Sequence, residues 1–483
     1  MANALVWFRN DLRLADNPAL QAALDAGYAP IPIYIHAPEE EGGWAPGGAA
    51  RAWRHRSLQA LDADLRRRGT RLRYFHGPSL QTLQTLAAAC DAEAVFWNRR
   101  YEPAIEKRDT AIKASLRAQG LHVESFNGSL LIEPWQLATK QGGPYKVFTP
   151  FWKAASAAMR MPLLHEPPTE FPRVDDGPRG VELASFQLQP TPRWDEGFWS
   201  HWQPGEAGAY ASLNVFSDGA LHAYRSDRDR PDRVGTSRMS PHLHHGEIAP
   251  WRVVAILQAL RGASDAASTA EIDGFVRQLG WREFGYHLLH HFPFTPEQNL
   301  NPRFADFPWA RVQPAARDAW CRGQTGVPIV DAGMRQLWET GWMHNRVRMV
   351  VGSYLCKHLR YHWREGARWF WDTLVDADLA NNTLGWQWIG GTGADAAPYF
   401  RIFNPVTQAE KFDPQGSYIA RWLPELAPLP AALRFAPWTD PRTLARHAPD
   451  YPRTPIVDLA RGRAAALDAY RRIGSDAERS DDG

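Results

Sequence analysis

The sequence predicts two fold classes in one chain, α/β followed by all-α. We expect an N-terminal doubly wound, parallel-sheet domain of the Rossmann-like type, a long linker, and a C-terminal all-helical domain. Apolar runs alternate with helical patterns up to residue 130, prolines break every period from 131 to 203, and helical periodicity dominates beyond 204. A chain of 483 residues is long enough for two or three domains with cores of their own.

Five apolar runs have the length of buried strands. They are ALVWF, IPIYIHA, RLRYFHG, AVFWNR and HVESF. The helical patterns between them cover residues 17–26, 49–68, 79–89 and 103–119. Alternating strands and helices favour right-handed crossovers and therefore a parallel sheet. The turn after the first run, RNDLRLADNP, has no glycine, so the G-x-G-x-x-G phosphate turn of nicotinamide-dinucleotide domains is absent.

The predicted boundaries define four segments. An α/β domain over 1–130 is followed by a linker over 131–203, in which EPPTEFP and QPTPRW interrupt any periodicity. A helical domain then spans 204–472. The last segment, 473–483, contains the polar stretch SDAERSDDG and is expected to be a disordered tail.

Composition and charge exclude several classes of protein. The net charge of +2 gives no global basic field, although a local basic groove remains open. No apolar run approaches the ~20 residues of a membrane span, and the start MANALVWFRNDLRL lacks the features of a secretory signal. Cys90, Cys321 and Cys356 are too far apart for a Cys-x-x-Cys site and odd in number. We expect a cytosolic monomer with no membrane contact and no obligate protein partner.

Tryptophan is unusually frequent, with 22 residues, ten of them from Trp281 to Trp388. The excess is typical of a core rich in indoles, of stacking on planar ligands, or of electron transport. Two of these indoles, Trp386 and Trp388, end the stretch DADLANNTLGWQW. Its Asn and Gly residues favour a loop that leads into a helix. The polar side chains of this loop then point to a specific ligand.

A second polar set lies in GWMHNRVRM. At 100° per residue, Trp342, Asn345, Arg348 and Met349 fall within one helical arc of about 120°, with Arg346 on its edge. An amide and a guanidinium on an apolar helix face need partners. One interpretation is a buried structural ion pair with one of the two aspartates of DADLANN. The other is a planar heteroaromatic ligand that needs donors and acceptors around its rim.

The stretch VGTSRMSPHLHHGEI predicts a helix start. Ser240 before Pro241 is typical of an N-cap with a first-turn proline. Hydroxyls, free N–H groups and Arg238 at such a start suit a phosphate, although most such sequences are only caps. The nearby arginines, five against three aspartates from Arg225 to Arg238, indicate a self-paired loop, of which a few side chains could touch phosphates.

Histidines recur at spacings that allow metal binding. They are His242, His244, His245, His287, His290 and His291. No cysteine or acidic ligand stands at a recognisable offset from them, so we predict no metal site and interpret these histidines as surface or supporting residues. No Ser–His–Asp order or nucleophile-elbow glycine pattern is present either.

The sequence resembles the DNA photolyase/cryptochrome family over nearly its whole length. The motifs, in family order, are VWFRNDLRLADNPAL, GTSRMSPHLHHGEI, GWREF, TGVPIVDAGMRQL, GWMHNRVRM, DADLANNTLGWQW and APYFRIFNP. Their details are most similar to bacterial cyclobutane pyrimidine dimer photolyases, and FVRQLGWREFGYHLLHHFPFTPEQNL is similar to the branch nearest plant cryptochromes.

The resemblance implies a U-shaped FAD in the helical domain. The implied FAD contacts are Tyr224, Thr236, Ser237, Arg238, Ser240, Gln278, Trp342, Asn345, Arg348, Asp376, Asp378 and Asn382. Residues from Tyr224 to Ser240 would hold the diphosphate and ribitol. Arg348 and Asp376 would pair beside the ring system, and Asn382 would face the ring nitrogen that gains or loses a proton.

The resemblance also implies separate duties for the two neighbouring indoles. Trp386 would begin an electron chain that continues through Trp363 to Trp309 at the surface. Trp388 would instead line the substrate pocket with Trp281 and stack on an extruded pyrimidine dimer. The remaining implied substrate or DNA contacts are Met349, Gln278, Arg282, Arg346 and Arg401.

Several positions discriminate among relatives. Met349 is similar to cyclobutane-dimer enzymes, where (6-4) photolyases have histidine, and Asn382 occupies a site that is usually Asp in plant cryptochromes. Gln278 departs from a lesion-contacting Glu, and Phe275 departs from a Trp. Ala104 and Ile105 replace the Asn and Glu of folate-binding relatives. Methenyltetrahydrofolate held differently, a deazaflavin, or no antenna all remain open.

The expected function is therefore light-driven repair of UV-damaged DNA. The resemblance implies a deoxyribodipyrimidine photo-lyase, in which reduced FAD donates an electron to a flipped-out cyclobutane dimer. A cryptochrome-type blue-light photoreceptor is the alternative, and a (6-4) photolyase is a third, which Met349 disfavours.

Overall fold

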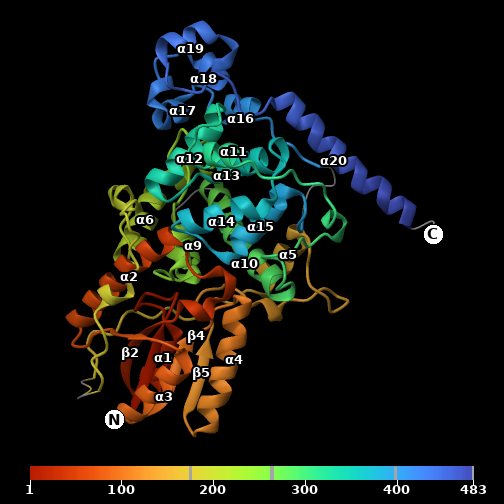
Figure 1. Ribbon diagram of the computed structural model, residues 1–483. Helices are drawn as coiled ribbons and strands as arrows, with labels where there is room; N and C mark the ends of the chain where they lie inside the picture. The colour runs from red at the N-terminus through yellow and green to blue at the C-terminus, as the bar shows by residue number, and fades with distance from the viewer. Residues whose placement is uncertain (173, 175–176, 262–265, 396–399, 481–483) are drawn as a thin grey trace. The chain divides into compact units, whose positions relative to one another are not determined.

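The computed structural model describes residues 1–172, 174, 177–261, 266–395 and 400–480 (Figure 1). It divides into two compact units that each gather several stretches of the chain. Unit 1 comprises Met1–His222, Ser237–Pro293 and Val375–Ala380. Unit 2 comprises Ala223–Thr236, Phe294–Leu374 and Asn381–Gly483. This division differs from the four consecutive segments that we expect from the sequence, whose bounds at 130, 203 and 472 stay a prediction.

Unit 1 is built on the predicted parallel sheet. Its strands are β1 (Asn3–Phe8), β2 (Ala29–His36), β3 (Arg73–His76), β4 (Ala92–Asn98) and β5 (His122–Phe126). They are parallel in the order β3-β2-β1-β4-β5. Each strand falls on one of the five apolar runs, so the doubly wound α/β prediction is confirmed. The order reverses direction at β1, the point where ligand crevices form in such sheets.

The first four helices of unit 1 also match the sequence prediction. They are α1 (Pro18–Asp25), α2 (Gly48–Arg67), α3 (Ser79–Ala89) and α4 (Pro103–Ala118). The side-chain period of a strand explains why both sheet faces are covered. Val6 and Phe8 of β1 pack in one core with α1 and α2, whereas Leu5 and Trp7 pack in a second core with α3 and α4.

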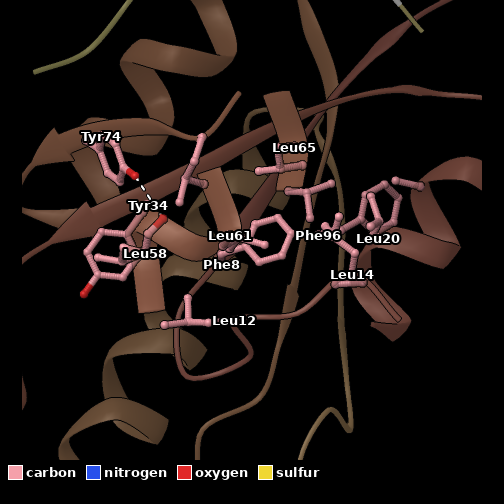
Figure 2. Close-up of a cluster of buried hydrophobic side chains, with 14 of the residues drawn as sticks. Phe8, Leu12, Leu14, Leu20, Tyr34, Leu58, Leu61, Leu65, Tyr74 and Phe96 are labelled. Carbon is pink, nitrogen blue, oxygen red and sulfur yellow. Dashed lines mark hydrogen bonds between the residues drawn. The ribbon is translucent and has the colours of Figure 1, made fainter. Parts of the chain in front are cut away.

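Figure 2 shows the first of these two cores. Phe8 of β1 and Phe96 of β4 lie among leucines of α2, including Leu58 and Leu61. The hydroxyl of Tyr74 donates a hydrogen bond to the Leu58 carbonyl at 3.3 Å, so this polar tip is satisfied. The sheet is therefore a rigid base for the loops at its carboxyl edge.

Within its described residues, unit 1 also contains five further α-helices, which irregular stretches such as 187–195 separate. These helices are α5 (Phe148–Ala158), α6 (Glu206–Asp218), α8 (Ser240–His244), α9 (Pro250–Leu260) and α10 (Ala266–His291). Helix α5 lies inside the expected linker, so the prediction of no regular structure there is wrong. Phe148, Phe151 and Ala155 are buried at helical spacing. The prolines before and after this segment concealed its short period.

Unit 2 is almost wholly helical, as predicted. Its helices are α7 (Tyr224–Asp227), α11 (Pro314–Cys321), α12 (Pro328–Thr340), α13 (Asn345–Ser353), α14 (Trp363–Thr373), α15 (Leu379–Gly390), α16 (Pro405–Phe412), α17 (Ser417–Trp422), α18 (Ala431–Phe435), α19 (Pro441–His447) and α20 (Leu459–Ser480). Helix α15 begins in unit 1 and continues into unit 2. A π-helical turn, Tyr354–His358, follows α13. Among the described residues, no helix is long and apolar enough to cross a bilayer.

Two local predictions about helix starts need correction. Ser240 is the first residue of α8 and not its N-cap, which is Met239. Trp342 precedes α13, whose N-cap is His344, so Trp342 does not share a helical arc with Arg348. His is outside the preferred N-cap set, which concealed this boundary.

The C-terminal end also differs from the prediction. Helix α20 runs to Ser480, so the expected disordered tail is helical over 473–480, while 481–483 lie outside the described residues. Good helix formers such as Ala and Glu continue the helical period there. Upstream, Ala466 and Ala469 of α20 pack against Phe304 and Phe400.

Candidate functional site

Helix α15 gives the two indoles of GWQW different surroundings. Trp386 is 2% exposed and meets Phe370 edge-on at 5.0 Å between ring centroids. At Gly366 of α14 a Cβ atom would lie only 2.0 Å from the Trp386 ring. Glycine at this position therefore leaves the space that the indole occupies. Trp388 is half-buried, and its N–H donates to the Asp395 carbonyl at 3.1 Å. One indole is enclosed and the other is accessible.

Two residues of the predicted electron chain, Trp363 and Trp309, share a ring neighbour in unit 2. Trp363 is fully buried, and its N–H donates to Asn299 Oδ1 at 2.8 Å. Trp309 is half-buried. The ring of His362 lies 5.0 Å from that of Trp309 and 5.4 Å from that of Trp363. Burial lowers the pKa of His362 to about 4, so this imidazole is neutral at physiological pH. Sequence reasoning missed His362, whose only signal is its place before Trp363.

The other residues that we expect to frame a ring in unit 2 make these contacts. Trp342 is buried, and the Arg348 guanidinium lies 5.9 Å from its ring centroid. Arg348 Nε also donates to the Met343 carbonyl at 2.8 Å. The Asn382 amide donates to the Ala367 carbonyl of α14 at 3.1 Å, which fixes that amide. Asn345 opens α13 as an exposed residue.

The predicted diphosphate residues divide between the units. Tyr224 and Thr236 belong to unit 2, where Tyr224 is buried and has the Arg228 guanidinium 5.7 Å from its ring centroid. Ser237 and Arg238 belong to unit 1. Ser240, in α8, is exposed, and this five-residue helix is too short for a strong dipole.

Arg238 has an unusual backbone. Its φ of 53° lies in the left-handed region, which costs a residue with a Cβ atom on the order of 1 kcal/mol. The guanidinium lies 4.1 Å from the Trp202 ring centroid, and burial lowers its pKa. Such strain is typical of a functional position, and the loop that holds it also contains Ser237, whose hydroxyl accepts from Met239 N at 3.3 Å.

Asp376 and Asp378 are both buried in unit 1. Asp378 Oδ2 accepts from the Tyr286 hydroxyl and lies 3.4 Å from His244 Nδ1. Burial by itself would raise the pKa of Asp378, but these hydrogen bonds and nearby positive charge hold it well below its ordinary value. The predicted Arg348–Asp376 ion pair joins residues of different units and stays a prediction.

Trp281, on α10, lies flat on a partner that the sequence analysis missed. The Phe148 ring of α5 is 3.7 Å from the Trp281 ring between centroids, with 8° between the planes. Trp281 is nevertheless only half-buried. Trp152, one turn along α5, is stacked with Phe148 at 6.4 Å. A rigid aromatic layer therefore supports one face of Trp281.

Two positions that depart from relatives lie on the same helix. Gln278 is half-buried and donates to the Gly274 carbonyl one turn back at 3.4 Å. Phe275 is buried and packs on Phe216 of α6 at 4.8 Å. Phe275 is therefore a core residue of unit 1, whereas Gln278 keeps an accessible amide.

The three predicted arginine contacts differ in their surroundings. Arg282 is tied into unit 1, where it donates to the Ser129 carbonyl at 2.7 Å and pairs with Glu283 at 3.2 Å, so an internal role suits it better than a DNA contact. Arg401 is exposed, with its guanidinium 5.7 Å from the Trp388 ring centroid. A DNA contact by either residue stays a prediction.

Arg346 lines a cavity of about 480 Å³ in unit 2. Its guanidinium pairs with Asp229 at 3.0 Å and lies 4.4 Å from the Phe412 ring centroid. The lining residues are Ser226, Asp229, Arg230, Arg346, Phe403, Gln408, Lys411 and Phe412. Cations beside aromatic faces suit a phosphate next to a base. Sequence reasoning missed Lys411 and Phe412, which follow the motif APYFRIFNP, and also Phe403, which belongs to it.

A second cavity, of about 240 Å³, lies at the carboxyl ends of β1 and β2 in unit 1. Trp7, Arg9, His36, Arg54 and Arg100 are among its lining residues. The Nε groups of Arg9 and Arg54 are buried and have no hydrogen-bond partner among the described residues. Buried donors around a hollow are suited to an anionic ligand.

The histidine and arginine clusters are mainly structural. Of the two interpretations, surface or supporting residues, the first is wrong for His242 and His245, which are fully buried. His242 pairs with Glu247. Within the described ranges, no group of three or more His, Cys, Asp or Glu could hold a metal ion. The arginine loop is self-paired, as in Arg230–Asp232 at 2.6 Å.

The donor set of these residues fits FAD. Hydroxyls and a guanidinium on a strained loop match a diphosphate, since oxygen anions need such donors. A buried ionised carboxylate, Asp378, and a fixed amide, Asn382, match the N–H and C=O edge of an isoalloxazine ring. The indole face of Trp342 matches a planar ring system.

Comparisons with known proteins lead to the same class. The DNA photolyase family profile matches residues 4–173, and the profile for the FAD binding domain of DNA photolyase matches residues 275–472. A deoxyribodipyrimidine photo-lyase of Agrobacterium fabrum is 46% identical over 98% of both chains. Cryptochrome-1 of Arabidopsis thaliana is 38% identical over 97% of this chain and 70% of that protein.

A solved structure is similar throughout. The crystal structure of a bacterial class III photolyase from Agrobacterium tumefaciens has 45% sequence identity, a TM-score of 0.93 and 98% coverage of both chains. The parallel α/β sheet, the helical unit and the flavin-type donor set define a two-part flavoprotein. The chain belongs to the DNA photolyase/cryptochrome family, and it has that family's FAD-binding domain. The motif APYFRIFNP lies partly outside the described residues, at 397–399.

Proposed function

We propose that this protein is a deoxyribodipyrimidine photo-lyase, a carbon–carbon lyase that uses blue light to split cyclobutane pyrimidine dimers in UV-damaged DNA. Bound, reduced FAD would supply the excited-state electron for the dimer. The observation that carries the proposal is the Trp281–Phe148 stack, a flat and half-exposed aromatic platform. Flat aromatic surfaces recover the cost of extruding bases from a duplex at ~1–3 kcal/mol per stacked base.

The lesion contacts follow from this platform. Trp281 would stack on the extruded dimer, and we assign Trp388, whose N–H is fixed by the Asp395 carbonyl, to the lesion as well. Gln278 would donate to and accept from a pyrimidine edge, because an amide can do both. Met349 would fill the space where a (6-4) enzyme needs a proton-transferring histidine. These roles favour cyclobutane dimers over (6-4) products.

The DNA backbone contacts are assigned by charge. Arg346 with Lys411 in the cavity of unit 2 would bind phosphate oxygens, with Phe412 as an apolar wall. Arg401 would add an exposed positive charge beside Trp388. Such contacts are independent of sequence and weaken as salt rises. They suit an enzyme that must find lesions in any sequence.

The FAD contacts are assigned from the fitting donors. We assign Tyr224, Thr236, Ser237, Arg238 and Ser240 to the diphosphate and ribitol. Trp342, Asn345, Arg348, Asp376, Asp378 and Asn382 would frame the ring, with a further contact from Gln278. Asp378 would accept from the ring N–H, because its pKa is held low and it remains a carboxylate.

The tryptophan chain would recharge the flavin from solution. Trp386, Trp363 and Trp309 would pass electrons inward, with His362 between the last two. Burial protects the inner two indoles from water and from side reactions. The second candidate function is a cryptochrome-type photoreceptor, which would use the same tryptophans. It is favoured by the 38% identity to Cryptochrome-1, which extends over 97% of this sequence.

An antenna chromophore is assigned to the cavity at the carboxyl ends of β1 and β2. Burial would raise the pKa of Glu41 there, yet the Arg100 guanidinium outweighs it and lowers the pKa to about 2. The surplus of arginines suits an anionic chromophore such as a deazaflavin or a folate. Ile105 is buried, so the folate site of relatives with Glu at this position is not reproduced. A near-ultraviolet absorption band beyond that of FAD would identify this chromophore.

The setting of the enzyme follows from its cysteines. Cys90, Cys321 and Cys356 are all buried and unbridged, which suits the reducing cytoplasm. We assign the working form as a monomer that needs damaged DNA and no protein partner.

The test is repair by the purified, reduced protein under blue light. Oligonucleotides with one cyclobutane dimer or one (6-4) product are assayed in parallel, with dark controls. Light-dependent loss of the cyclobutane dimer alone is expected. If neither lesion is repaired while the flavin still photoreduces, the photoreceptor is the better account.

A further inference from the structure

Three side chains of unit 1 form a buried polar group around one carboxylate. Asp378 Oδ2 accepts a hydrogen bond from the Tyr286 hydroxyl of α10, and His244 Nδ1 of α8 lies 3.4 Å from the same oxygen. Asp378 and Tyr286 are 7% and 8% exposed. Two donors from separate helices that converge on one oxygen fix both the position and the rotation of the carboxylate.

The electrostatics of this group are consistent with an ionised aspartate. Burial raises the pKa of Tyr286 well above its ordinary value, so its hydroxyl stays protonated and can only donate to Asp378. The Arg282 guanidinium lies 5.0 Å from the Tyr286 ring centroid and adds positive charge on the same side. Glu283 is also buried beside Arg282, and burial raises its pKa to about 7. The net surroundings of Asp378 are therefore donors and cations.

Tyr286 is anchored independently of Asp378. Its ring meets that of Tyr101 edge-on at 5.8 Å, and Arg282, which lies over its ring, donates to the Ser129 carbonyl at 2.7 Å. Removing the hydroxyl alone would keep these contacts. The hydroxyl thus serves the carboxylate rather than the packing of α10.

We propose that Tyr286 and His244 are positioning residues that hold the Asp378 carboxylate in the orientation in which it binds the flavin ring. The inference rests on the proposed contact between Asp378 and FAD. The pair lowers the ordering cost of that contact, because a carboxylate already fixed on Oδ2 loses no rotational freedom when the ring binds. It also keeps a negative charge at a constant place beside the ring, which sets the potential of the flavin.

The test compares Tyr286→Phe with a matched control, Tyr101→Phe. Tyr101 is a second buried tyrosine of unit 1 whose hydroxyl also donates to a carboxylate, Glu133 Oε1 at 2.9 Å. For each purified holoprotein we would measure the flavin absorption spectrum, the midpoint potential by dye titration, and the rate of FAD release on dilution. Melting temperature reports the structural cost of each variant.

Tyr286→Phe is expected to shift the flavin spectrum and potential and to release FAD about tenfold faster, as for a lost charge-assisted hydrogen bond. Tyr101→Phe is expected to lower the melting temperature and leave spectrum and potential unchanged. A Tyr286→Phe protein that melts lower but keeps the wild-type spectrum and potential would overturn the inference. The role would then be structural.

A second variant tests the inference if Tyr286→Phe folds poorly. His244→Gln keeps a donor near Asp378 and should shift the spectrum in the same direction by a smaller amount, since the 3.4 Å contact is the longer of the two. In an Asp378→Asn background, Tyr286→Phe should add no further spectral shift; an additive shift would contradict the inference. If the wild-type protein does not repair DNA but the variants show these spectral shifts, the result counts against the proposed function and not against the inference.

Discussion

Two aromatic regions of the molecule use tryptophan in opposite ways. In unit 2, Trp386 and Trp363 are almost completely buried, and aromatic neighbours such as Phe370 meet Trp386 edge-on. In unit 1, Trp281 is half-exposed and lies parallel to Phe148 at 3.7 Å. One arrangement encloses an indole on all sides, whereas the other presents it on a flat support.

The two surroundings suit one residue type to two kinds of chemistry. An enclosed indole cannot stack on a base, but it keeps a fixed environment that excludes water, as an electron carrier requires. A supported, half-exposed indole loses little on burial and offers a flat surface to a nucleobase. Trp386 and Trp388, two residues apart on α15, repeat the same contrast within one helix.

The largest effect is expected for Trp386→Phe. The rate of photoreduction of oxidised flavin should fall to a small fraction of the wild-type rate, because phenylalanine is far harder to oxidise than tryptophan. The measurement is flavin bleaching under blue light with an external reductant. Trp422→Phe, on α17 of unit 2, is the control and should photoreduce as the wild type does. Equal photoreduction rates in both variants would show that Trp386 is not part of the electron-transfer chain.

Trp281→Ala should weaken the binding of damaged DNA without affecting FAD binding. The loss of one stacked base, ~1–3 kcal/mol, corresponds to roughly 5- to 150-fold weaker binding of dimer-containing DNA, with FAD content unchanged. Fluorescence anisotropy with a labelled oligonucleotide measures it. Trp135→Ala removes an indole that is 47% exposed and should leave affinity unchanged. Unaltered affinity in Trp281→Ala would end the stacking assignment.

Gly366→Ala should break the enclosure of Trp386. The new Cβ atom would lie 2.0 Å from the ring, and the helices must separate at a cost of about 1–3 kcal/mol in the free energy of unfolding. Gly385→Ala, on α15, has no atom within 4 Å of its Cβ position and should be neutral or stabilising. Urea unfolding compares them. Similar stabilities of the two variants would show that Trp386 is not tightly enclosed.

The smallest effect concerns pH and the end of α15. Lys357 is buried, and its Nζ donates to the Gly390 carbonyl at 2.7 Å. Burial lowers its pKa from 10.5 to about 7, so between these values the unfolded chain binds a proton that the folded chain does not. Stability should therefore rise with pH across that window.

Lys357→Met should remove this rise in stability. Urea unfolding at several pH values between about 7 and 10 measures the slope. Lys411→Met removes an exposed lysine and should keep the wild-type slope. An unchanged slope in Lys357→Met would mean that the ammonium is retained in the folded protein.

Local periodicity predicted much of the fold and little of the support for the site. All five strands and the helices that flank them follow from apolar runs, because buried strands and amphipathic helices leave strong local patterns. The loop predicted before Trp386 is wrong, because α15 already begins at Leu379 and contains Asn381, Asn382 and Gly385. The start of α13 was missed because its cap is His344, outside the usual cap residues.

Contacts between distant segments could not be predicted. Phe148 under Trp281 and Tyr286 beside Asp378 join parts of the chain whose proximity depends on tertiary folding. His362 between two indoles is a neighbour in sequence, but its ring direction depends on its place as the N-cap of α14. Motif resemblance names the residues that are expected to touch a ligand, whereas the neighbours of these residues emerge only from the structure.

The most direct test of the division between the two aromatic regions is the repair rate of pre-reduced Trp386→Phe protein. The flavin is reduced chemically, and loss of a cyclobutane dimer is followed under blue light. The account predicts a rate close to that of the pre-reduced wild type, because an enclosed electron carrier is needed only to recharge the flavin. A collapse of repair in the pre-reduced variant would contradict it and would mean that Trp386 acts in the repair step itself.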